Sequence, residues 1–151
     1  MIKKKPQEWL KVTKNGLFVV PGNFFIDPNI ASDMAVVTHA HADHARSGHK
    51  KVIDTPETLE IMKVRYVNGF SQSPYGLEYG RKLAVNNVTI WLAPAGHVLG
   101  SSQIVIELRF SNKLFIFFTL KFELIIKLIC SLFKFFSYVI IAFCIIQSLF
   151  E

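Results

Sequence analysis

The first part of the chain alternates short apolar runs with turn residues. The segments GLFVV at 16–20 and NFFID at 23–27 are typical of strands, and a Pro-Gly-Asn turn at 21–23 separates them. The segment MAVVTHA at 34–40 is a run of small and β-branched residues, which predicts a buried strand that ends among histidines. This pattern predicts that the chain builds a sheet before it reaches residue 41.

A helix and further strands follow this first group. The segment TPETLEIMKVRYV at 55–67 has Thr55 as a helix cap and Pro56 at the first helical position. Apolar positions follow at Leu59, Met62, Val64 and Val67, and the segment is predicted to be a helix. The segment at 81–96 reads as two strands around an Asn-Asn turn. Strands mixed with a helix predict an α/β fold.

The composition changes sharply near residue 114. Residues 114–151 contain no glycine, proline, histidine, aspartate, asparagine or arginine, and Phe, Ile, Leu, Lys and Ser dominate. One interpretation is a frame slip near Phe117, because these residue types have A/T-rich codons and a selected chain keeps turn residues between its elements. The other is a membrane helix within 128–150, since 135–150 carries no charge. We therefore expect a partial domain at 1–113 and an apolar, helical tail at 114–151.

Length, charge and cysteine content narrow the class of protein. The 151 residues suit one ordinary domain. The net charge of +6 suits a polyanionic partner, although the lysines at 3–5 are also typical of a solvated terminus. Cys130 and Cys144 have no zinc-knuckle spacing and imply no disulfide framework, so a reducing compartment is expected. The basic start lacks a following apolar stretch, which argues against a secretory signal and predicts a cytoplasmic location.

The stretch THAHADHARSGH at 38–49 holds four of the five histidines. His39 and His41 are two residues apart, so in an extended chain both imidazoles point the same way and can reach one ion. Asp43 and His44 follow where the chain must turn, and they add a carboxylate and a third imidazole nearby. Imidazole nitrogen and carboxylate oxygen are zinc ligands, and this density predicts a metal site.

His97, the fifth histidine, also follows a strand-like run. Gly96 and Gly100 lie on either side of it, which suits a loop that approaches a ligand or another loop closely. Taken alone, such a histidine is more often structural than metal-bound. Beside the upstream cluster it becomes a metal-ligand candidate, because a three-histidine site needs a ligand distant in sequence.

These motifs together resemble a known fold family. The segment THAHADH resembles the second signature motif of the metallo-β-lactamase fold, and PAGHVLGSSQI at 94–104 resembles its third motif in the nuclease branch. The segment GLFVVPGNFFIDP at 16–28 resembles the first motif. The combination is most similar to the DNA ligase-associated exonucleases, bacterial relatives of the β-CASP RNA-processing enzymes. The resemblance runs from residue 9 to about 113, which is the first part of such an enzyme.

The resemblance implies a fold, a reaction and a set of roles. The fold would be the N-terminal part of an αββα sandwich, and the reaction would be cleavage of DNA phosphodiester bonds by a zinc-bound hydroxide. His39, His41 and His97 match the ligands of a first Zn²⁺, whereas Asp43 and His44 match ligands of a second; Asp43 is also the catalytic candidate. Asp27 matches a residue that orients ligands from behind, and the serines at 101–102 match small residues packed behind the third motif. DNA rather than RNA would be the nucleic-acid partner, with a ligase or helicase as protein partners.

The chain also departs from the family pattern. In the family, the strand after the third motif ends in a Gly-Asp pair whose carboxylate bridges the two metals. Here the expected strand KLFIFF at 113–118 runs into TLKFELIIK, and no aspartate follows Asp54. We therefore expect a truncated relative that holds at most one zinc ion tightly and is weak or inactive. His49 matches no ligand, and we expect it at the surface.

Two other interpretations stay open at this stage. The chain could be a different hydrolase on the same fold, acting on a thioester or a lactam, because function depends on the site rather than on the fold. It could also be a non-catalytic, membrane-associated remnant anchored through 128–150.

Overall fold

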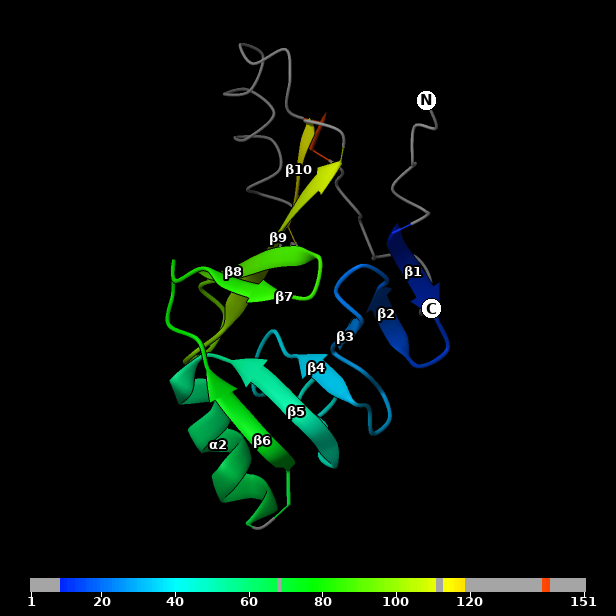
Figure 1. The fold of residues 1–151 in the computed structure, drawn as a ribbon. Coiled ribbons are helices and arrows are strands. Elements are labelled where there is room, and N and C mark those ends of the chain that lie inside the picture. Colours follow the sequence, from blue (N-terminus) through cyan, green and yellow to red (C-terminus); the bar gives the residue numbers. More distant parts are fainter. Residues whose placement is uncertain (1–8, 68, 111–112, 119–139, 142–151) are drawn as a thin grey trace, which may run out of the picture.

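The structure is a computed structural model that describes residues 9–67, 69–110, 113–118 and 140–141. These residues form two sheets and a single helix (Figure 1). The protein is therefore a mixed α/β protein, as the sequence pattern predicts.

The first sheet contains six strands that are neighbours in chain order. Its first three strands pair antiparallel, and the pairs from the third strand to the sixth are parallel. Because parallel strands end at the same edge of a sheet, loops after the fourth and fifth strands meet there. The strands are β1 (Leu10–Thr13), β2 (Gly16–Val19), β3 (Phe24–Ile26), β4 (Met34–Val36), β5 (His49–Asp54) and β6 (Ser71–Gly76).

The second sheet has the order β11-β10-β9-β8-β7. The strands from β7 to β10 pair antiparallel, and β10 pairs with β11 in parallel. Asn86 adopts a left-handed φ of 50° in the predicted turn between β7 and β8, a conformation that Asn tolerates better than most residues. The bounds are β7 (Leu83–Val85), β8 (Val88–Pro94), β9 (Ser102–Phe110), β10 (Lys113–Phe118) and β11 (Ile140–Ile141).

The predicted boundary between 113 and 114 lies at the start of β10. This strand is the expected KLFIFF strand, and it pairs with β9 along its whole length. The parts of the predicted helical tail that the structure describes, 114–118 and 140–141, are strands. The rest of that tail, including nearly all of the predicted membrane segment at 128–150, lies outside the described residues. Among the described residues, no helix has the length and apolar character to cross a membrane.

The helix α2 (Pro56–Tyr66) packs on the outer face of the first sheet. Thr55 caps it as predicted, and Leu59 and Met62 are buried against β4 and β5. Two of the apolar positions, Val64 and Val67, do not face the core, because their exposed fractions are 80% and 73%. Val64 lies about 200° around the helix from Met62, and Val67 follows the last helical residue.

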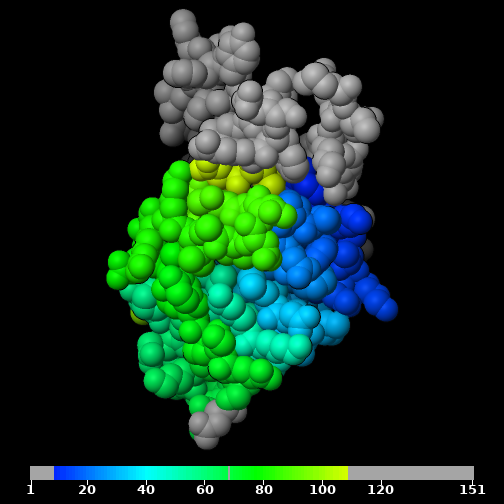
Figure 2. All heavy atoms as spheres, viewed as in Figure 1, coloured from blue at the N-terminus to red at the C-terminus, as the bar shows by residue number. Residues whose placement is uncertain are grey.

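The main core lies between the two sheets. Alternating side chains of β2 and β3 meet those of β8 and β9, as in other strands with one buried face. The members of this core from these four strands are Leu17, Val19, Phe24, Ile26, Val88, Ile90, Leu92, Ile104, Ile106 and Leu108. The layers therefore follow the order helix, first sheet, second sheet. In the space-filling view, the blue, cyan and green residues form one continuous surface (Figure 2).

Candidate metal centre

Three imidazoles meet beyond the ends of two strands in different sheets. His39 and His41 follow β4, and His97 follows β8. His39 Nε2 lies 3.1 Å from His41 Nδ1, which lies 3.4 Å from His97 Nε2. One nitrogen from each ring lies within 4.8 Å of the other two. The fold thus brings the distant histidine to the upstream pair, as the metal-site prediction requires.

The spacing of these nitrogens fits a transition-metal ion. Two nitrogens bound to one tetrahedral zinc ion at about 2.0–2.1 Å are about 3.3 Å apart, which is close to the two contacts in this cluster. Imidazole is a ligand suited to zinc and its neighbours in the first transition row. His39 is 2% exposed, whereas His41 and His97 are exposed, so the cluster has a buried side and a solvent side. Such a site can bind an ion and still admit water or substrate.

A hydrogen-bonded chain behind His39 sets the orientation of its ring. His39 Nδ1 lies 2.9 Å from Thr38 Oγ1, and this hydroxyl donates to Asp27 Oδ2 over 2.7 Å. The Thr38 backbone N–H also donates to Asp27 Oδ1 over 2.8 Å. Because the hydroxyl proton points at the carboxylate, the hydroxyl oxygen accepts the Nδ1 proton, and Nε2 keeps its lone pair for the cluster. Sequence reasoning missed Thr38, for which the available signal was its place directly before the first histidine.

Asp27 holds a second histidine as well as Thr38. His44 Nδ1 lies 2.7 Å from Asp27 Oδ2. The centroids of the His44 and His39 rings are 4.2 Å apart. Asp27 has a φ of 44°, in the left-handed region that non-glycine residues seldom adopt. An unusual backbone conformation at a residue that serves two partners is typical of a functional site.

The His44 ring lies beside the His39 ring, and Asp43 contacts His44, but both residues lie outside the group of three imidazole nitrogens. Asp43 Oδ2 is 3.3 Å from His44 Nε2, and the Asp43 side chain is 72% exposed. The chain turns at this point, since the backbone N–H groups of His44 and Ala45 both donate to the His41 carbonyl. The roles of Asp43 and His44 as ligands, and of Asp43 in catalysis, stay predictions.

The loop that carries His97 is closed by its own hydrogen bonds. The backbone N–H groups of His97 and Val98 donate to Ser101 Oγ over 3.1 and 3.2 Å. The Ser101 backbone N–H donates to the Val98 carbonyl over 2.9 Å. Ser101 and Ser102 are each 3% exposed, so both serines are buried at the end of this loop.

The expectation that His49 lies at the surface is wrong. His49 is the first residue of β5, and its side chain is completely buried. Its Nδ1 accepts the Ser32 backbone N–H over 3.2 Å. Burial lowers the pKa of His49, because the charged imidazole loses its hydration. The surface expectation failed because β5 begins at this residue and turns its side chain inward.

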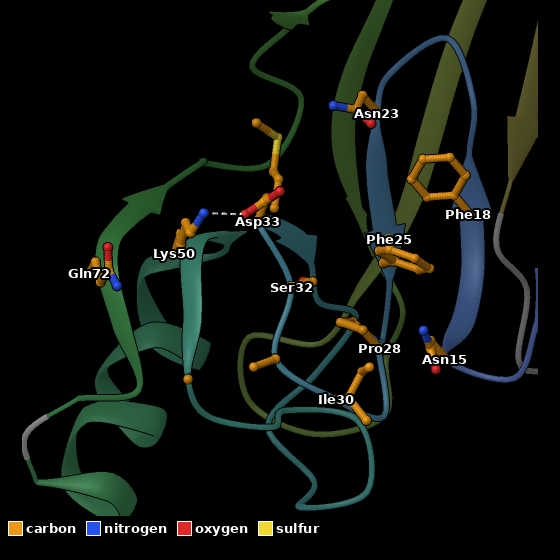
Figure 3. Close-up of a pocket in the computed structure, with 13 residues that line it drawn as sticks. Asn15, Phe18, Asn23, Phe25, Pro28, Ile30, Ser32, Asp33, Lys50 and Gln72 are labelled. Carbon is orange, nitrogen blue, oxygen red and sulfur yellow. Dashed lines mark ion pairs between the residues drawn. The ribbon is translucent and has the colours of Figure 1, made fainter.

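A separate pocket of about 410 Å³ lies on the outer face of the first sheet (Figure 3). Met34 and Lys50, near the amino ends of β4 and β5, contribute to its wall, as do Phe18 and Phe25 from the neighbouring strands. Lys50 forms an ion pair of 2.6 Å with Asp33 there. The three imidazoles do not line this pocket, so it is distinct from the candidate metal centre.

Comparisons with known proteins give two sequence relatives. No family model matches the chain. It is 30% identical over 80 residues to a metal-dependent hydrolase from Methanosphaerula palustris, which covers 53% of this chain and 34% of the hydrolase. It is 25% identical over 100 residues to a probable DNA ligase from Opitutus terrae, which covers 66% of this chain and 10% of the ligase. The chain thus spans about a third or less of the length of these relatives.

Among solved structures, the chain is similar to a protein of unknown function from Enterococcus faecalis. The TM-score is 0.41 at 17% sequence identity, over 56% of this chain and 24% of that protein.

Proposed function

We propose that this protein is a metal-dependent hydrolase and that His39, His41 and His97 bind one zinc ion. The observation that carries the proposal is the meeting of three imidazole nitrogens within 4.8 Å, from segments 56 residues apart. The similarity to a metal-dependent hydrolase over 80 residues supports it. Zinc is the ion proposed because three histidines with an open side form a set of protein ligands found in catalytic zinc sites.

We further propose that the chain is the N-terminal part of a metallo-β-lactamase-fold DNA exonuclease. The three motif-like stretches support this assignment, together with the helix, sheet, sheet layers. The similarity to a probable DNA ligase and the net charge of +6 favour a nucleic-acid substrate, since cationic proteins gain affinity for phosphate backbones. A cytoplasmic location and association with ligase or helicase partners belong to the same proposal.

The proposed roles follow from the positions of the side chains. His39, His41 and His97 would hold the ion, while Asp27, through Thr38, would keep the His39 ring in place. Zinc supplies a Lewis acid and lowers the pKa of water, so that a nucleophile forms near neutral pH. Asp43, exposed beside the cluster, would accept a proton and, with His44, would hold a second and weaker ion.

Metal content and substrate range test this proposal together. The purified chain is equilibrated with Zn²⁺ and desalted, and bound metal is measured by elemental analysis. We expect about one tightly bound ion per chain. Cleavage of end-labelled single-stranded DNA is then compared with hydrolysis of a thioester and a β-lactam. We expect slow, metal-dependent cleavage of DNA.

Matched variants make the outcome decisive. His41→Ala should abolish both zinc retention and DNA cleavage, whereas Glu60→Ala, an exposed change on α2, should alter neither. A wild-type chain that retains no zinc, or a His41→Ala chain that retains as much, would contradict the metal centre. Turnover of the thioester or lactam but not of DNA would assign the alternative substrate class. Recovery with lipid vesicles and no turnover would favour the membrane-associated remnant.

A further inference from the structure

The carbonyl of Gly100 is held by two threonine hydroxyls at the start of α2. Thr55 Oγ1 donates to Gly100 O over 2.7 Å, and Thr58 Oγ1 donates to the same oxygen over 3.1 Å. Both threonines are completely buried. Gly100 belongs to the loop that carries His97, so the helix start contacts the loop of the proposed metal centre directly.

The contact is too close for any residue other than glycine. A Cβ atom on Gly100 would lie 2.7 Å from the hydroxyl oxygens of Thr55 and Thr58 and 2.8 Å from the Thr58 nitrogen. Gly100 also has a φ of 76°, a conformation that side chains disfavour. The loop backbone therefore rests on the first turn of α2 itself.

Further hydrogen bonds hold the same loop from other directions. The Ser102 backbone N–H donates to the Thr38 carbonyl over 2.7 Å, directly before His39. The Tyr79 hydroxyl donates to the Ser101 carbonyl over 2.9 Å. The position of His97 relative to His39 therefore depends on how the loop is held against β4 and α2.

Ordinary helix capping does not account for Thr58. Thr55 is the N-cap and accepts the Thr58 backbone N–H over 3.3 Å, which is the usual capping bond. In a capping box, the side chain three residues later reaches back to the N–H of the N-cap residue. Here Asp54 Oδ1 accepts that Thr55 N–H over 2.7 Å. The Thr58 hydroxyl, which also lies close to the buried Asp54 carboxyl and accepts from Thr55 Oγ1 over 3.1 Å, donates to Gly100 O.

We propose that Thr58, together with Thr55, is a positioning residue that holds His97 at the metal centre by binding the Gly100 carbonyl. This inference rests on the proposed function, because the purpose of the contact is the placement of a zinc ligand. Thr58 is the informative residue, since its hydroxyl can be removed without removing the helix cap.

Three variants test the inference. Thr58→Val removes the hydroxyl and keeps the side-chain shape, and Thr58→Ser keeps the hydroxyl. Thr89→Val makes the same chemical change in β8, near the turn end of that strand rather than at the loop. Amide hydrogen exchange at 98–102 is measured in the metal-free protein relative to amides of β5, which corrects for any global loss of stability. Zinc affinity is measured on the same samples by competition with a chelator.

We expect Thr58→Val to speed exchange in the loop by about 10-fold, which corresponds to the loss of one hydrogen bond. We expect it to weaken zinc binding by about 10-fold, at the low end of the effect of residues that orient metal ligands. Thr58→Ser and Thr89→Val should match the wild type in loop exchange and in zinc affinity.

Unchanged loop exchange in Thr58→Val would overturn the contact, and faster exchange with unchanged zinc affinity would overturn the positioning role of Thr58. A wild-type chain that binds no zinc would refute the proposed function. The exchange data would still test whether the Thr58 hydroxyl holds the Gly100 carbonyl.

Discussion

His39 and His49 belong to the same twelve-residue stretch and are both buried, yet their surroundings differ. His39 follows the carboxyl end of β4, and its Nε2 faces His41 within the three-imidazole cluster. His49 begins β5, and its Nδ1 accepts a backbone N–H from Ser32. The sheet thus places one histidine where other imidazoles converge and the other where a backbone N–H binds one ring nitrogen, Nδ1. Burial alone does not separate a ligand candidate from a structural histidine, whereas the groups around the ring do: other imidazoles surround His39, and a backbone N–H contacts His49 Nδ1.

The difference follows from the direction of the strands. Because β4 and β5 are parallel, a residue just after β4 and a residue that begins β5 lie at opposite ends of the sheet. Loops at the carboxyl end of parallel strands meet at one edge, which is where sites form in such sheets. The His97 loop reaches this edge from the second sheet, and the pocket in Figure 3 lies toward the amino ends.

The largest expected effect is the loss of a cluster imidazole. His41→Ala should weaken zinc binding by more than about 100-fold, because loss of a ligand exceeds the 10–100-fold effect of residues behind one. Its melting temperature without metal should stay near that of the wild type, since His41 is exposed. Chelator competition and thermal melts check both values. An unchanged zinc affinity would remove His41 from the site.

A smaller effect is expected from the carboxylate behind the cluster. Asp27→Asn should weaken zinc binding by about 10-fold to 100-fold, because Thr38 and His44 both rely on that carboxylate. Asp33→Asn is the matched control, since Asp33 pairs with exposed Lys50 away from the cluster. Equal zinc affinities for the two variants would show that Asp27 does not orient the ligands.

The buried histidine should affect stability and not metal binding. His49→Ala should lower the free energy of unfolding by about 2–3 kcal/mol, through a cavity and an unsatisfied Ser32 N–H. Its zinc affinity should equal that of the wild type as long as it is folded. Urea denaturation gives the first quantity and chelator competition the second. Weakened zinc binding in the folded variant would show that His49, like His39, contributes to the metal site.

The smallest effect is a pH dependence from the same residue. Because burial lowers the pKa of His49, the unfolded imidazole takes up a proton first as pH falls below about 6.5. The free energy of unfolding should therefore decrease as pH falls from about 6.5 through the lowered pKa of the folded state. Above about pH 6.5 the imidazole is neutral in both states, so His49 adds no pH dependence there. His49→Gln should show a shallower slope in metal-free urea titrations at a series of pH values. Identical slopes would show that His49 does not titrate differently on folding.

Several elements follow from local sequence. The turn residues and apolar runs predicted β2, β3, β4, β7 and β8, and Thr55 with Pro56 predicted the start of α2. The β10 strand was expected only from the family resemblance. Two of the strands that were not predicted, β5 and β6, have polar residues where a strand pattern would need apolar ones. β5 starts with HKK, and β6 is SQSPYG at an edge of its sheet, where a proline is tolerated. These segments form strands because they pair with neighbouring strands, and a local sequence pattern holds no information about that pairing.

By itself, the sequence determined the residue types available for the chemistry. The spacing of His39 and His41, together with the glycine-flanked His97, was enough to predict imidazoles that share an ion, because alternation in an extended chain is a local property. Only the tertiary structure decided that His97 reaches that pair, that Thr38 and Asp27 stand behind His39, and that His49 is buried. These outcomes depend on strand order and on the packing of two sheets, which join residues far apart in the chain.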